Sequence, residues 1–406
     1  MSFSDWREVR LGDVCTYSTA KVSITEINED NYISTENMLP NKNGVVKSSG
    51  LPTVASVTRY FTDNVLVSNI RPYFKKIWCA DREGGCSNDV LVFVVKDKRI
   101  LDSRFLFYCL SNDEFFNYVM AGAKGTKMPR GDKGAILKYP VHLPTLSEQK
   151  AIAATLSALD DMIELNNQIN KTLEEMAQAI FKSWFVDFEP FRDGEFEESE
   201  IGPIPKGWKV GMLGDFVEIV DNRGKTPPLS DVKTEYPIID VRALSGESRV
   251  IDYSNCTKYV EKEIYDSWFR SGHPKHLDIL ISTVGSIAEM KMFYGNKGCI
   301  AQNVVAFRSN GISPCYLYQY LQYSKGDLLS YNIGSVQPSI KVTHVIKYKI
   351  IVPDEKTMSS FDMLMESISD QIHRNANESQ ILIAIRDTLL PKLISGEIRV
   401  PVEEVV

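Results

Sequence analysis

Long apolar runs are missing from this sequence of 406 residues. No window approaches the roughly 18 consecutive apolar residues of a membrane-spanning helix, and residues 1–10 are polar and charged, without the apolar core of a signal peptide. Cysteine is scarce too: the seven cysteines form no Cys-x-x-Cys pair, which argues against a disulfide framework and predicts buried free thiols. We therefore expect a soluble cytoplasmic protein that spans no membrane.

Sequence signatures of catalysis are missing as well. Gly-Lys-Thr at residues 224–226 resembles the end of a phosphate loop, but Ile219 stands where that loop needs its first glycine. Glu-Gln-Lys at residues 148–150 has a nuclease-like Glu-x-Lys form, yet no Pro-Asp pair precedes it at a suitable distance. No methyltransferase Asn/Asp-Pro-Pro-Tyr/Phe string and no glycine-rich S-adenosylmethionine loop occur. We therefore expect no catalytic site on this chain.

Metal-ligating clusters are equally scarce. His273 and His276 have a spacing that could hold a metal, but no cysteine or further histidine nearby completes a coordination shell. We expect these two histidines to lie in a solvated loop, and we expect the chain to hold no metal.

Net positive charge, the usual mark of a nucleic-acid partner, is lacking overall, since the formal net charge is −7. The distribution is more informative than the sum. Residues 1–145 and 208–353 each carry +3, whereas residues 146–207 carry −8 and residues 354–406 carry −5. Two mildly basic segments that alternate with acidic ones are compatible with a DNA-binding protein, although this signal is weak by itself.

The sequence contains an internal repeat, and a chain of this length is expected to form at least two domains. The order of the repeated blocks never changes, while the offset drifts between 202 and 214 residues, as loop insertions would cause. The blocks are Trp6-x4-Leu11-Gly12-Asp13 with Trp208-x4-Leu213-Gly214-Asp215, then residues 65–68 with 279–282, 89–93 with 303–307, 105–107 with 316–318, and 136–139 with 345–348.

Each half of the repeat predicts one lobe of short strands followed by one long helix. Residues 90–95 and 347–352 have the composition of strands, and residues 105–110 and 316–323 that of short helices. The first long helix should begin near Thr145, where Thr145 and Glu148 fit a capping box, and should continue to about Phe185. The acidic segment between it and the second lobe, residues 189–207, is expected to be a surface linker.

Both long helices show apolar positions that alternate by four and three residues, which is the seam of a coiled coil. The seam of the first is Ile152, Leu156, Leu159, Ile163, Asn166, Asn170, Leu173, Ala177, Ile180 and Trp184, and that of the second is Phe361, Met365, Ile368, Ile372, Asn375, Ser379, Leu382, Arg386, Leu389 and Leu393. The polar positions Asn166 and Asn170 match Asn375 and Ser379 at an offset of 209. We predict an antiparallel pair that acts as a spacer, about 60 Å long at 1.5 Å per residue. The alternative is that each helix covers one lobe separately.

With this repeat and these two helices, the chain resembles the specificity subunit of Type I restriction–modification enzymes. The strings that carry the resemblance are Ser-Asn-Ile-Arg-Pro-Tyr at residues 68–73, Glu-Gln-Lys-Ala-Ile-Ala at 148–153, Pro-Lys-Gly-Trp at 205–208 and Leu-Leu-Pro-Lys-Leu-Ile-Ser-Gly-Glu-Ile at 389–398. No single string is decisive, but their order and spacing together are specific and cover nearly the whole chain.

The resemblance implies an α+β chain with two α/β target-recognition domains, separated by two helices that form an antiparallel coiled coil with a pseudo-twofold repeat. We place the first target-recognition domain at residues 1–145, the central spacer helix at 146–187, a linker at 188–207, the second target-recognition domain at 208–353, and the C-terminal spacer helix and tail at 354–406. The implied partners are double-stranded DNA, two methyltransferase subunits and, optionally, two restriction subunits. The implied cofactors belong to those partners: S-adenosylmethionine on the methyltransferase, and ATP and magnesium on the restriction subunit.

Candidate DNA contacts are polar and cationic side chains in the two lobes. Those of the first lobe are Arg71, Tyr73, Lys75, Lys76, Lys124, Thr126, Lys127 and Arg130, and those of the second are Arg223, Lys225, Arg242, Lys291, Ser335, Gln337 and Lys341. The loops around Gly125 and Gly334 align at an offset of 209 and therefore suit a shared task. The alternative for any one of these residues is ordinary solvated surface.

The sequence is compatible with two functions of different kinds. One is sequence-specific recognition of a duplex, in which the two lobes read different halves of a split, asymmetric site. The other is a coiled-coil interaction scaffold without DNA specificity. The family strings favour the first.

Overall fold

The computed structural model describes residues 6–295, 297–334 and 336–401. It divides into two compact units, of which unit 1 comprises Met1–Ile163 with Ile381–Val406 and unit 2 comprises Glu164–Gln380. Each unit contains one lobe and part of each long helix, because α5 (Leu146–Phe185) and α10 (Glu355–Ile394), of 40 residues each, run through both units. No helix in the described part of the chain is long and apolar enough to cross a membrane.

The lobe of unit 1 is built on two four-stranded sheets. The antiparallel sheet β2-β9-β6-β7 consists of β2 (Cys15–Tyr17), β9 (Val90–Val95), β6 (Val65–Ser68) and β7 (Ile77–Cys79). The sheet β3-β5-β8-β4 consists of β3 (Lys21–Ser23), β5 (Ser56–Tyr60), β8 (Gly84–Cys86) and β4 (Tyr32–Ile33). β1 (Arg7–Arg10) pairs with β10 (Pro140–Leu143), and the helices are α1 (Leu11–Val14), α2 (Ser103–Ser111), α3 (Asp113–Ala121) and α4 (Lys133–Ile136).

The lobe of unit 2 repeats the first of these sheets. Its antiparallel sheet β14-β17-β15-β16 consists of β14 (Val217–Val220), β17 (Val304–Ser309), β15 (Ile279–Ser282) and β16 (Met290–Met292). β13 (Lys209–Met212) pairs with β18 (Lys349–Val352), and the helices are α6 (Lys262–Trp268), α7 (Pro314–Tyr323), α8 (Lys325–Ser330) and α9 (Val342–Val345). Short 3-10 helices are η1 (Ile24–Glu26), η2 (Pro72–Phe74), η3 (Glu189–Phe191), η4 (Leu213–Asp215), η5 (Val241–Leu244) and η6 (Tyr253–Asn255).

The predicted repeat is confirmed strand by strand. The blocks at residues 65–68 and 279–282 are β6 and β15, which occupy the same inner position in the two sheets, and the next pair of blocks begins β9 and β17. All four strands are apolar along their central residues because both faces of each sheet are covered. The predicted short helices correspond to α2 and α7.

The recurring Leu-Gly-Asp block has the same local geometry in both lobes. In the first lobe the Gly12 N–H donates to the Leu137 carbonyl at 2.7 Å, and Asp13 accepts from the Arg10 N–H at 3.1 Å. A Cβ on Gly12 would lie 3.0 Å from that carbonyl oxygen. Gly214 donates to Ile346 at 2.8 Å in the second lobe. The glycine is therefore required by the close approach of two backbone segments.

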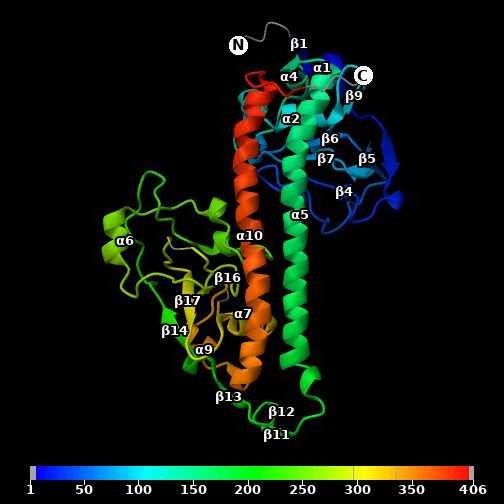
Figure 1. The fold of residues 1–406 in the computed structure, drawn as a ribbon. Helices are drawn as coiled ribbons and strands as arrows, with labels where there is room; N and C mark the ends of the chain where they lie inside the picture. Colours follow the sequence, from blue (N-terminus) through cyan, green and yellow to red (C-terminus); the bar gives the residue numbers. More distant parts are fainter. Residues whose placement is uncertain (1–5, 296, 335, 402–406) are drawn as a thin grey trace. The chain divides into compact units, whose positions relative to one another are not determined.

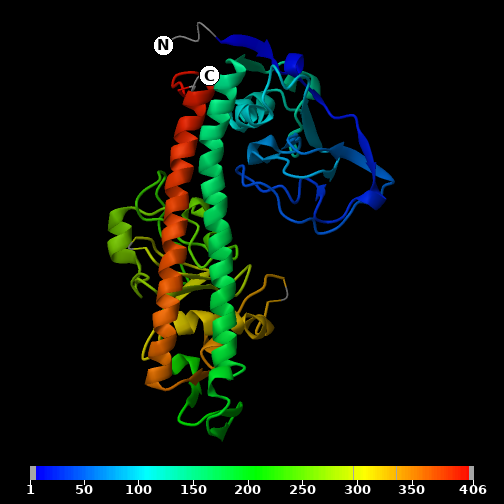
Figure 2. The ribbon, with the colours of Figure 1, turned by 45° about the vertical axis from the view of Figure 1, so that its right-hand side comes forward.

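Within each unit, the segments of the two long helices run antiparallel side by side, as predicted (Figures 1 and 2). Within unit 2, the Asn375 Nδ2 donates to Asn170 Oδ1 at 2.9 Å, and the Asn170 Nδ2 donates to the Ile372 carbonyl at 3.3 Å. Asn166 donates to Glu378 at 3.0 Å. The predicted capping box at Thr145 is confirmed within unit 1, where Glu148 accepts from the Thr145 N–H at 3.1 Å. Separate helices that each cover one lobe are therefore excluded.

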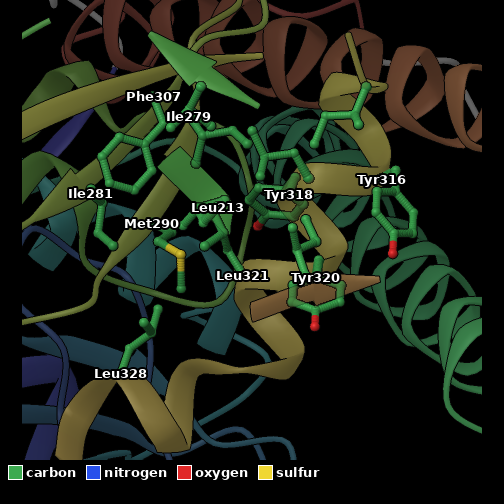
Figure 3. Close-up of a cluster of buried hydrophobic side chains, with 14 of the residues drawn as sticks. Leu213, Ile279, Ile281, Met290, Phe307, Tyr316, Tyr318, Tyr320, Leu321 and Leu328 are labelled. Atoms are coloured by element: carbon green, nitrogen blue, oxygen red, sulfur yellow. The ribbon is translucent and has the colours of Figure 1, made fainter. Parts of the chain in front are cut away.

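One core in unit 2 joins the sheet, α7 and the long helices. Figure 3 shows Ile279 and Phe307 of the sheet beside side chains of α7 such as Tyr318 and Leu321. Aromatic side chains from both long helices, including Phe181 of α5 and Phe361 of α10, belong to the same cluster. Because each fully buried side chain of this size contributes about 1.5–3 kcal/mol, the lobe and its helix segments stabilise one another.

The expected linker at residues 189–207 is more ordered than its composition suggested. It contains the hairpin of β11 (Phe196–Ser199) and β12 (Gly202–Pro205), and Ile204 of this hairpin is buried. Phe188 and Phe191 pack edge-on against Trp208. Apolar anchors within an acidic segment are the reason that it folds onto unit 2.

All seven cysteines are buried free thiols, as predicted, and six of them belong to apolar clusters. Burial raises the pKa of Cys79 to about 11, which keeps its thiol protonated at neutral pH.

Candidate functional site

The two loops that align in the sequence form equivalent turns. In the first lobe, the N–H and carbonyl groups of Lys124 and Arg130 exchange two hydrogen bonds of 2.9 Å. In the second lobe, the Ile333 N–H donates to the Ser339 carbonyl at 2.9 Å, at the same offset of 209. We call residues 124–130 and 333–339 the paired loops.

Each paired loop is hydrogen-bonded to the segment that follows the central strand of its lobe. The Arg71 N–H donates to the Pro129 carbonyl at 2.8 Å, and the Gly285 N–H donates to the Pro338 carbonyl at 2.9 Å. Because these bonds match at both offsets, 214 and 209, each lobe presents the same composite surface: one paired loop and one strand-end segment, residues 68–73 or 282–287. This surface is the candidate site.

The first paired loop is strongly exposed and carries cations. The side chains of Lys124 and Arg130 are 82% and 57% exposed, and Thr126 and Lys127 are exposed as well. Lys124 pairs with Asp132 at 2.9 Å, and Arg130 pairs with Asp89 at 3.2 Å. Such exposed pairs are worth little energetically, so the cations can exchange them for other anions.

The strand-end segment of the first lobe has an unusual backbone. Arg71 and Lys75 adopt φ values of 49° and 51°, in the left-handed region that non-glycine residues seldom occupy. Between them, Tyr73 is 48% exposed and Phe74 is 38% exposed. The Nε of Arg71 is buried without a hydrogen-bond partner. The turn thus displays two aromatic rings beside an incompletely satisfied guanidinium group.

The next two predicted cations, which follow just after this segment, have protein partners. Lys75 forms an ion pair with Asp113 at 2.7 Å. The Nζ of Lys76 donates to the Thr35 carbonyl at 2.6 Å, and burial lowers the pKa of this amine. Arg71 and Tyr73 are therefore better placed for an external ligand than Lys75 and Lys76.

In the second lobe the structure brings Arg223 to the strand-end segment. Its guanidinium group pairs with Asp221 at 2.6 Å and donates to the Thr283 hydroxyl at 3.4 Å. Lys225 is exposed in the same loop. Arg242 lies on η5, where it pairs with Asp240 at 2.8 Å.

One predicted contact is wrong, and one lies outside the described residues. Lys291 is only 1% exposed, and its Nζ donates to the carbonyls of Gly246 (2.7 Å) and Ser248. Burial lowers the pKa of this amine to about 8. Lysine side chains are usually exposed, and the sequence therefore predicted an exposed Lys291. In the structure, strand β16 points this side chain into the lobe. Gln337 and Lys341 are exposed, and Ser335 lies outside the described residues.

The expectation that the two histidines lie in a solvated loop is confirmed for His276, which is exposed in a turn, and is wrong for His273, which is partly buried. The ring of His273 stacks on Tyr265 with centroids 3.7 Å apart and planes inclined by 5°. Its Nε2 lies 2.9 Å from the Tyr265 carbonyl. Within the described residues, no group of three or more His, Cys, Asp or Glu side chains could hold a metal ion.

Comparison with known proteins agrees with this duplicated arrangement. The family model for the type I restriction–modification DNA specificity domain matches twice, at residues 3–175 and 205–378. The chain belongs to this family. Each match covers one lobe together with part of the long helix that follows it, which is the unit of repetition found in the structure.

Similar proteins carry the same description. The type I restriction enzyme MjaIX specificity subunit of Methanocaldococcus jannaschii is 26% identical over 73% of this chain and 69% of its own length. The type I restriction enzyme HindI specificity subunit of Haemophilus influenzae is 24% identical over 97% of this chain and 100% of its own length. The crystal structure of a type I restriction–modification system S subunit from M. genitalium matches with a TM-score of 0.54, 17% identity and 96% coverage of both chains, which shows a shared fold.

The family assigns a role in the DNA specificity of a type I restriction–modification system. A coiled-coil scaffold without DNA specificity is not favoured, because both halves of the chain match the specificity domain.

Proposed function

We propose that the two lobes read different halves of a split, asymmetric site in double-stranded DNA. The observation that carries this proposal is the composite surface that occurs once in each lobe with different side chains. Equivalent backbones favour equivalent approaches to the duplex, and unequal side chains favour unequal half-sites.

The side-chain differences are of the kind that distinguishes bases. Arg71 aligns with Gly285 at an offset of 214. In the paired loops, at an offset of 209, Lys127 aligns with Val336 and Met128 with Gln337. Arginine favours the acceptors of guanine and glutamine favours adenine, whereas glycine and valine offer no such donors. The exposed cations of the first paired loop are suited to phosphate oxygens, which position the protein without specifying sequence.

The chain is also proposed to scaffold two methyltransferase subunits and, in restriction complexes, two restriction subunits. S-adenosylmethionine would then be bound by the methyltransferase partner, and ATP and magnesium by the restriction partner. This chain would contribute DNA sequence recognition and the placement of its partners, and none of the bond-making steps.

Mapping methylated adenines across the genome of a host that carries this chain with its methyltransferase tests the proposal. We expect a motif of two unequal half-sites separated by bases that are not specified. A palindromic or uninterrupted motif would contradict it, because the two lobes would then not read independently.

A further inference from the structure

A buried arginine of the second lobe is bound to both long helices within unit 2. Arg249 is 0% exposed, and it lies in the loop that precedes the parallel bridge between Val250 and Met292. Its Nη2 lies 2.6 Å from Glu174 Oε2 and its Nε 2.8 Å from Glu174 Oε1, so the ion pair is bidentate. The Arg249 backbone N–H also donates to Glu174 at 3.0 Å.

The same guanidinium group reaches two further elements. Its Nη1 donates to the Ser369 hydroxyl of α10 at 2.5 Å, and its centre lies 5.0 Å from the ring centroid of Tyr318 in α7. One side chain therefore connects a lobe loop with α5, α10 and α7. All of these partners belong to unit 2.

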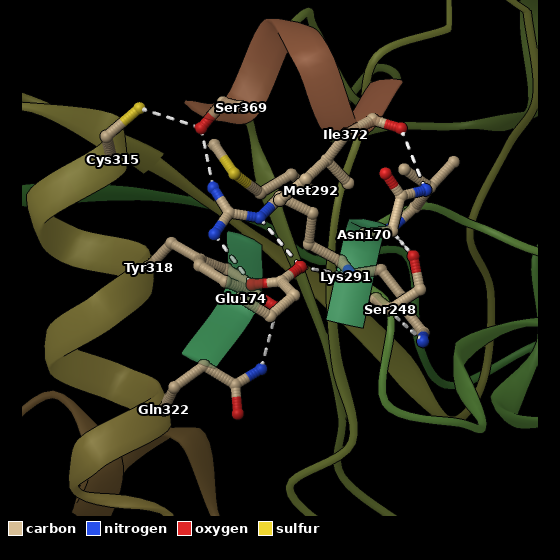
Figure 4. A network of polar contacts seen from close by, with 12 residues as sticks. Asn170, Glu174, Ser248, Lys291, Met292, Cys315, Tyr318, Gln322, Ser369 and Ile372 are labelled. Atoms are coloured by element: carbon tan, nitrogen blue, oxygen red, sulfur yellow. Dashed lines mark hydrogen bonds and ion pairs between the residues drawn. The ribbon is translucent and has the colours of Figure 1, made fainter. Parts of the chain in front are cut away.

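The loop that carries Arg249 is held from its other side as well. Lys291 of β16 donates to the carbonyls of Gly246 and Ser248, and the Met292 N–H donates to the Arg249 carbonyl at 2.8 Å. Figure 4 shows Lys291 and Ser248 beside Glu174. The edge strand β16 is therefore connected to Glu174 of α5 through the short loop that carries Arg249.

This arrangement specifies position more than it adds stability. Two charges lose hydration on burial, so an apolar pair of similar size is often at least as stable. A planar bidentate pair, in contrast, is satisfied at one separation and one orientation only. The apolar contacts of the shared core, such as Phe181 against Tyr320, would tolerate small shifts, whereas the Arg249–Glu174 pair would not.

We propose that Arg249 and Glu174 are positioning residues that set the length of the unread gap between the two half-sites. They hold the second lobe at one place on the helix segments of its own unit. This inference rests on the proposed split site, because the gap that a complex accepts depends on how firmly each lobe is held on the helices. With the pair removed, the lobe can move slightly, and neighbouring gap lengths become acceptable.

The test uses the full chain assembled with its methyltransferase. Plasmids carry the native half-sites with the native gap n, or with gaps of n−1 and n+1, and a second set carries one altered half-site. A displacement of about 1 Å at a reacting centre can cost roughly a hundredfold in rate, so the native complex should methylate gap n at least about a hundredfold faster. In the double variant Arg249→Met with Glu174→Leu, we expect this preference to fall below about tenfold, with altered half-sites still refused.

Two further variants complete the test, one as a control and one in case the double variant does not fold. The exposed pair Lys297 and Glu235, 2.6 Å apart, is replaced by two glutamines and should leave the preference for gap n unchanged. If the double variant does not fold, Arg249→Lys keeps the charge, loses the bidentate geometry, and should relax the gap in the same way.

A folded variant that still accepts only gap n would overturn the inference, and so would equal relaxation in the control. A loss of rate at every gap without relaxation would indicate a merely structural role and would also overturn it. A native complex that recognises no split site would instead contradict the proposed function, which is a distinguishable result.

Discussion

The paired loop of the first lobe carries three cations, Lys124, Lys127 and Arg130, whereas its counterpart at residues 333–339 carries none. Both loops nevertheless make the same backbone hydrogen bonds to the strand-end segment of their own lobe. The two lobes therefore share the backbone structure of this surface and differ in its side chains. Affinity for phosphate and discrimination between bases are therefore expected to be divided unequally between the lobes.

The lobes differ again in the segment between β2 and β6 of the first lobe, which corresponds to the segment between β14 and β15 of the second. In the first lobe this region and its neighbour form the sheet β3-β5-β8-β4, whereas in the second it is largely irregular and contains α6, η5 and η6. The drift of the repeat offset from 202 to 214 residues arises here. This region covers one face of the shared sheet in both lobes, with different elements in each, so its length can vary while the shared strands keep their order.

The lobes also differ in how they are fixed to the helices of their own units. In unit 2 the cation comes from the lobe, as Arg249, and its partner is buried in α5. In unit 1 the cation is Arg386 of α10, which pairs with Asp160 of α5 at 2.8 Å, and the lobe contributes the Tyr108 hydroxyl to Asp160 at 2.7 Å. Asp160 and Ser369 are equivalent at an offset of 209. The same position of the repeated helix therefore binds Tyr108 of the lobe in unit 1 and Arg249 of the lobe in unit 2.

The largest effect is expected from breaking the buried pair of unit 2 on one side only. Arg249→Met leaves the buried carboxylate of Glu174 without its ion-pair partner, and should lower the free energy of local opening of the second lobe by about 3–5 kcal/mol. Hydrogen exchange of peptides from β15 and β16 measures this opening.

Removing both partners is the control for that change. Arg249→Met with Glu174→Leu should recover part of this loss, because the buried ion pair is removed whole and the remaining cost, about 1–3 kcal/mol, comes from the Arg249 backbone N–H that loses its acceptor. Equal losses in the single and the double variant would show that the ion pair contributes net stability and does not mainly fix the position of the lobe.

The repeated frame was predictable from the sequence because its causes are local. β6 and β15 are short apolar runs at matching positions, and the seam asparagines break an otherwise apolar pattern at a fixed offset, which locates the contact between Asn170 and Asn375. Pattern and period express these features directly. The paired loops were likewise found by alignment, and their hydrogen bonds bear out their equivalence.

Other parts depended on tertiary contacts that a sequence does not display. Arg249 and Lys291 resemble surface residues by type, and only the packing of one loop between β16 and the helices shows that both are buried. The strands of the second sheet of unit 1 are two to five residues long, too short for a clear alternating pattern. The hairpin of β11 and β12 was hidden by its acidic composition.

The next effect concerns the cations of the first paired loop. Replacing Lys124, Lys127 and Arg130 together by glutamine should weaken duplex binding by the assembled complex for all sequences alike. Because each phosphate contact contributes about 0.9 to the slope of log affinity against log salt, the slope should flatten by up to about 2.7. Titrations of specific and unrelated duplexes at several salt concentrations measure it.

A matched pair of cations at the other end of the same sheet provides the control. Lys98 and Arg99 are 73% and 89% exposed and follow the end of β9 opposite to Ser68. Glutamine at these two positions should leave the slope unchanged. If the loop variant bound DNA with the native slope, the first paired loop would not be a phosphate contact.

A smaller effect is expected at the attachment of unit 1. Asp160→Asn retains an acceptor for Tyr108, and Arg386 retains Asp387 at 2.9 Å. Because the Asp160 side chain is 30% exposed, its ion pair is partly screened, and the opening free energy of α2 should fall by only about 1 kcal/mol. A loss as large as that for Arg249→Met would mean that the two attachments are equivalent after all.

The smallest effect should be a pH dependence confined to the second lobe. His373 of α10 stacks on Tyr294 with centroids 4.4 Å apart, and burial, reinforced by the nearby His276, lowers the pKa of His373. The unfolded chain therefore binds this proton first, so the stability contributed by the neutral ring is present above the ordinary histidine pKa of about 6.5 and declines as the pH falls through it. His373→Phe keeps a ring against Tyr294 and should reduce the decline between pH 7.5 and 5.5, measured by hydrogen exchange of β16 and α10. His344→Asn, at an exposed histidine of α9, should leave the decline as it is. An unaltered decline in His373→Phe would assign the pH dependence to other groups.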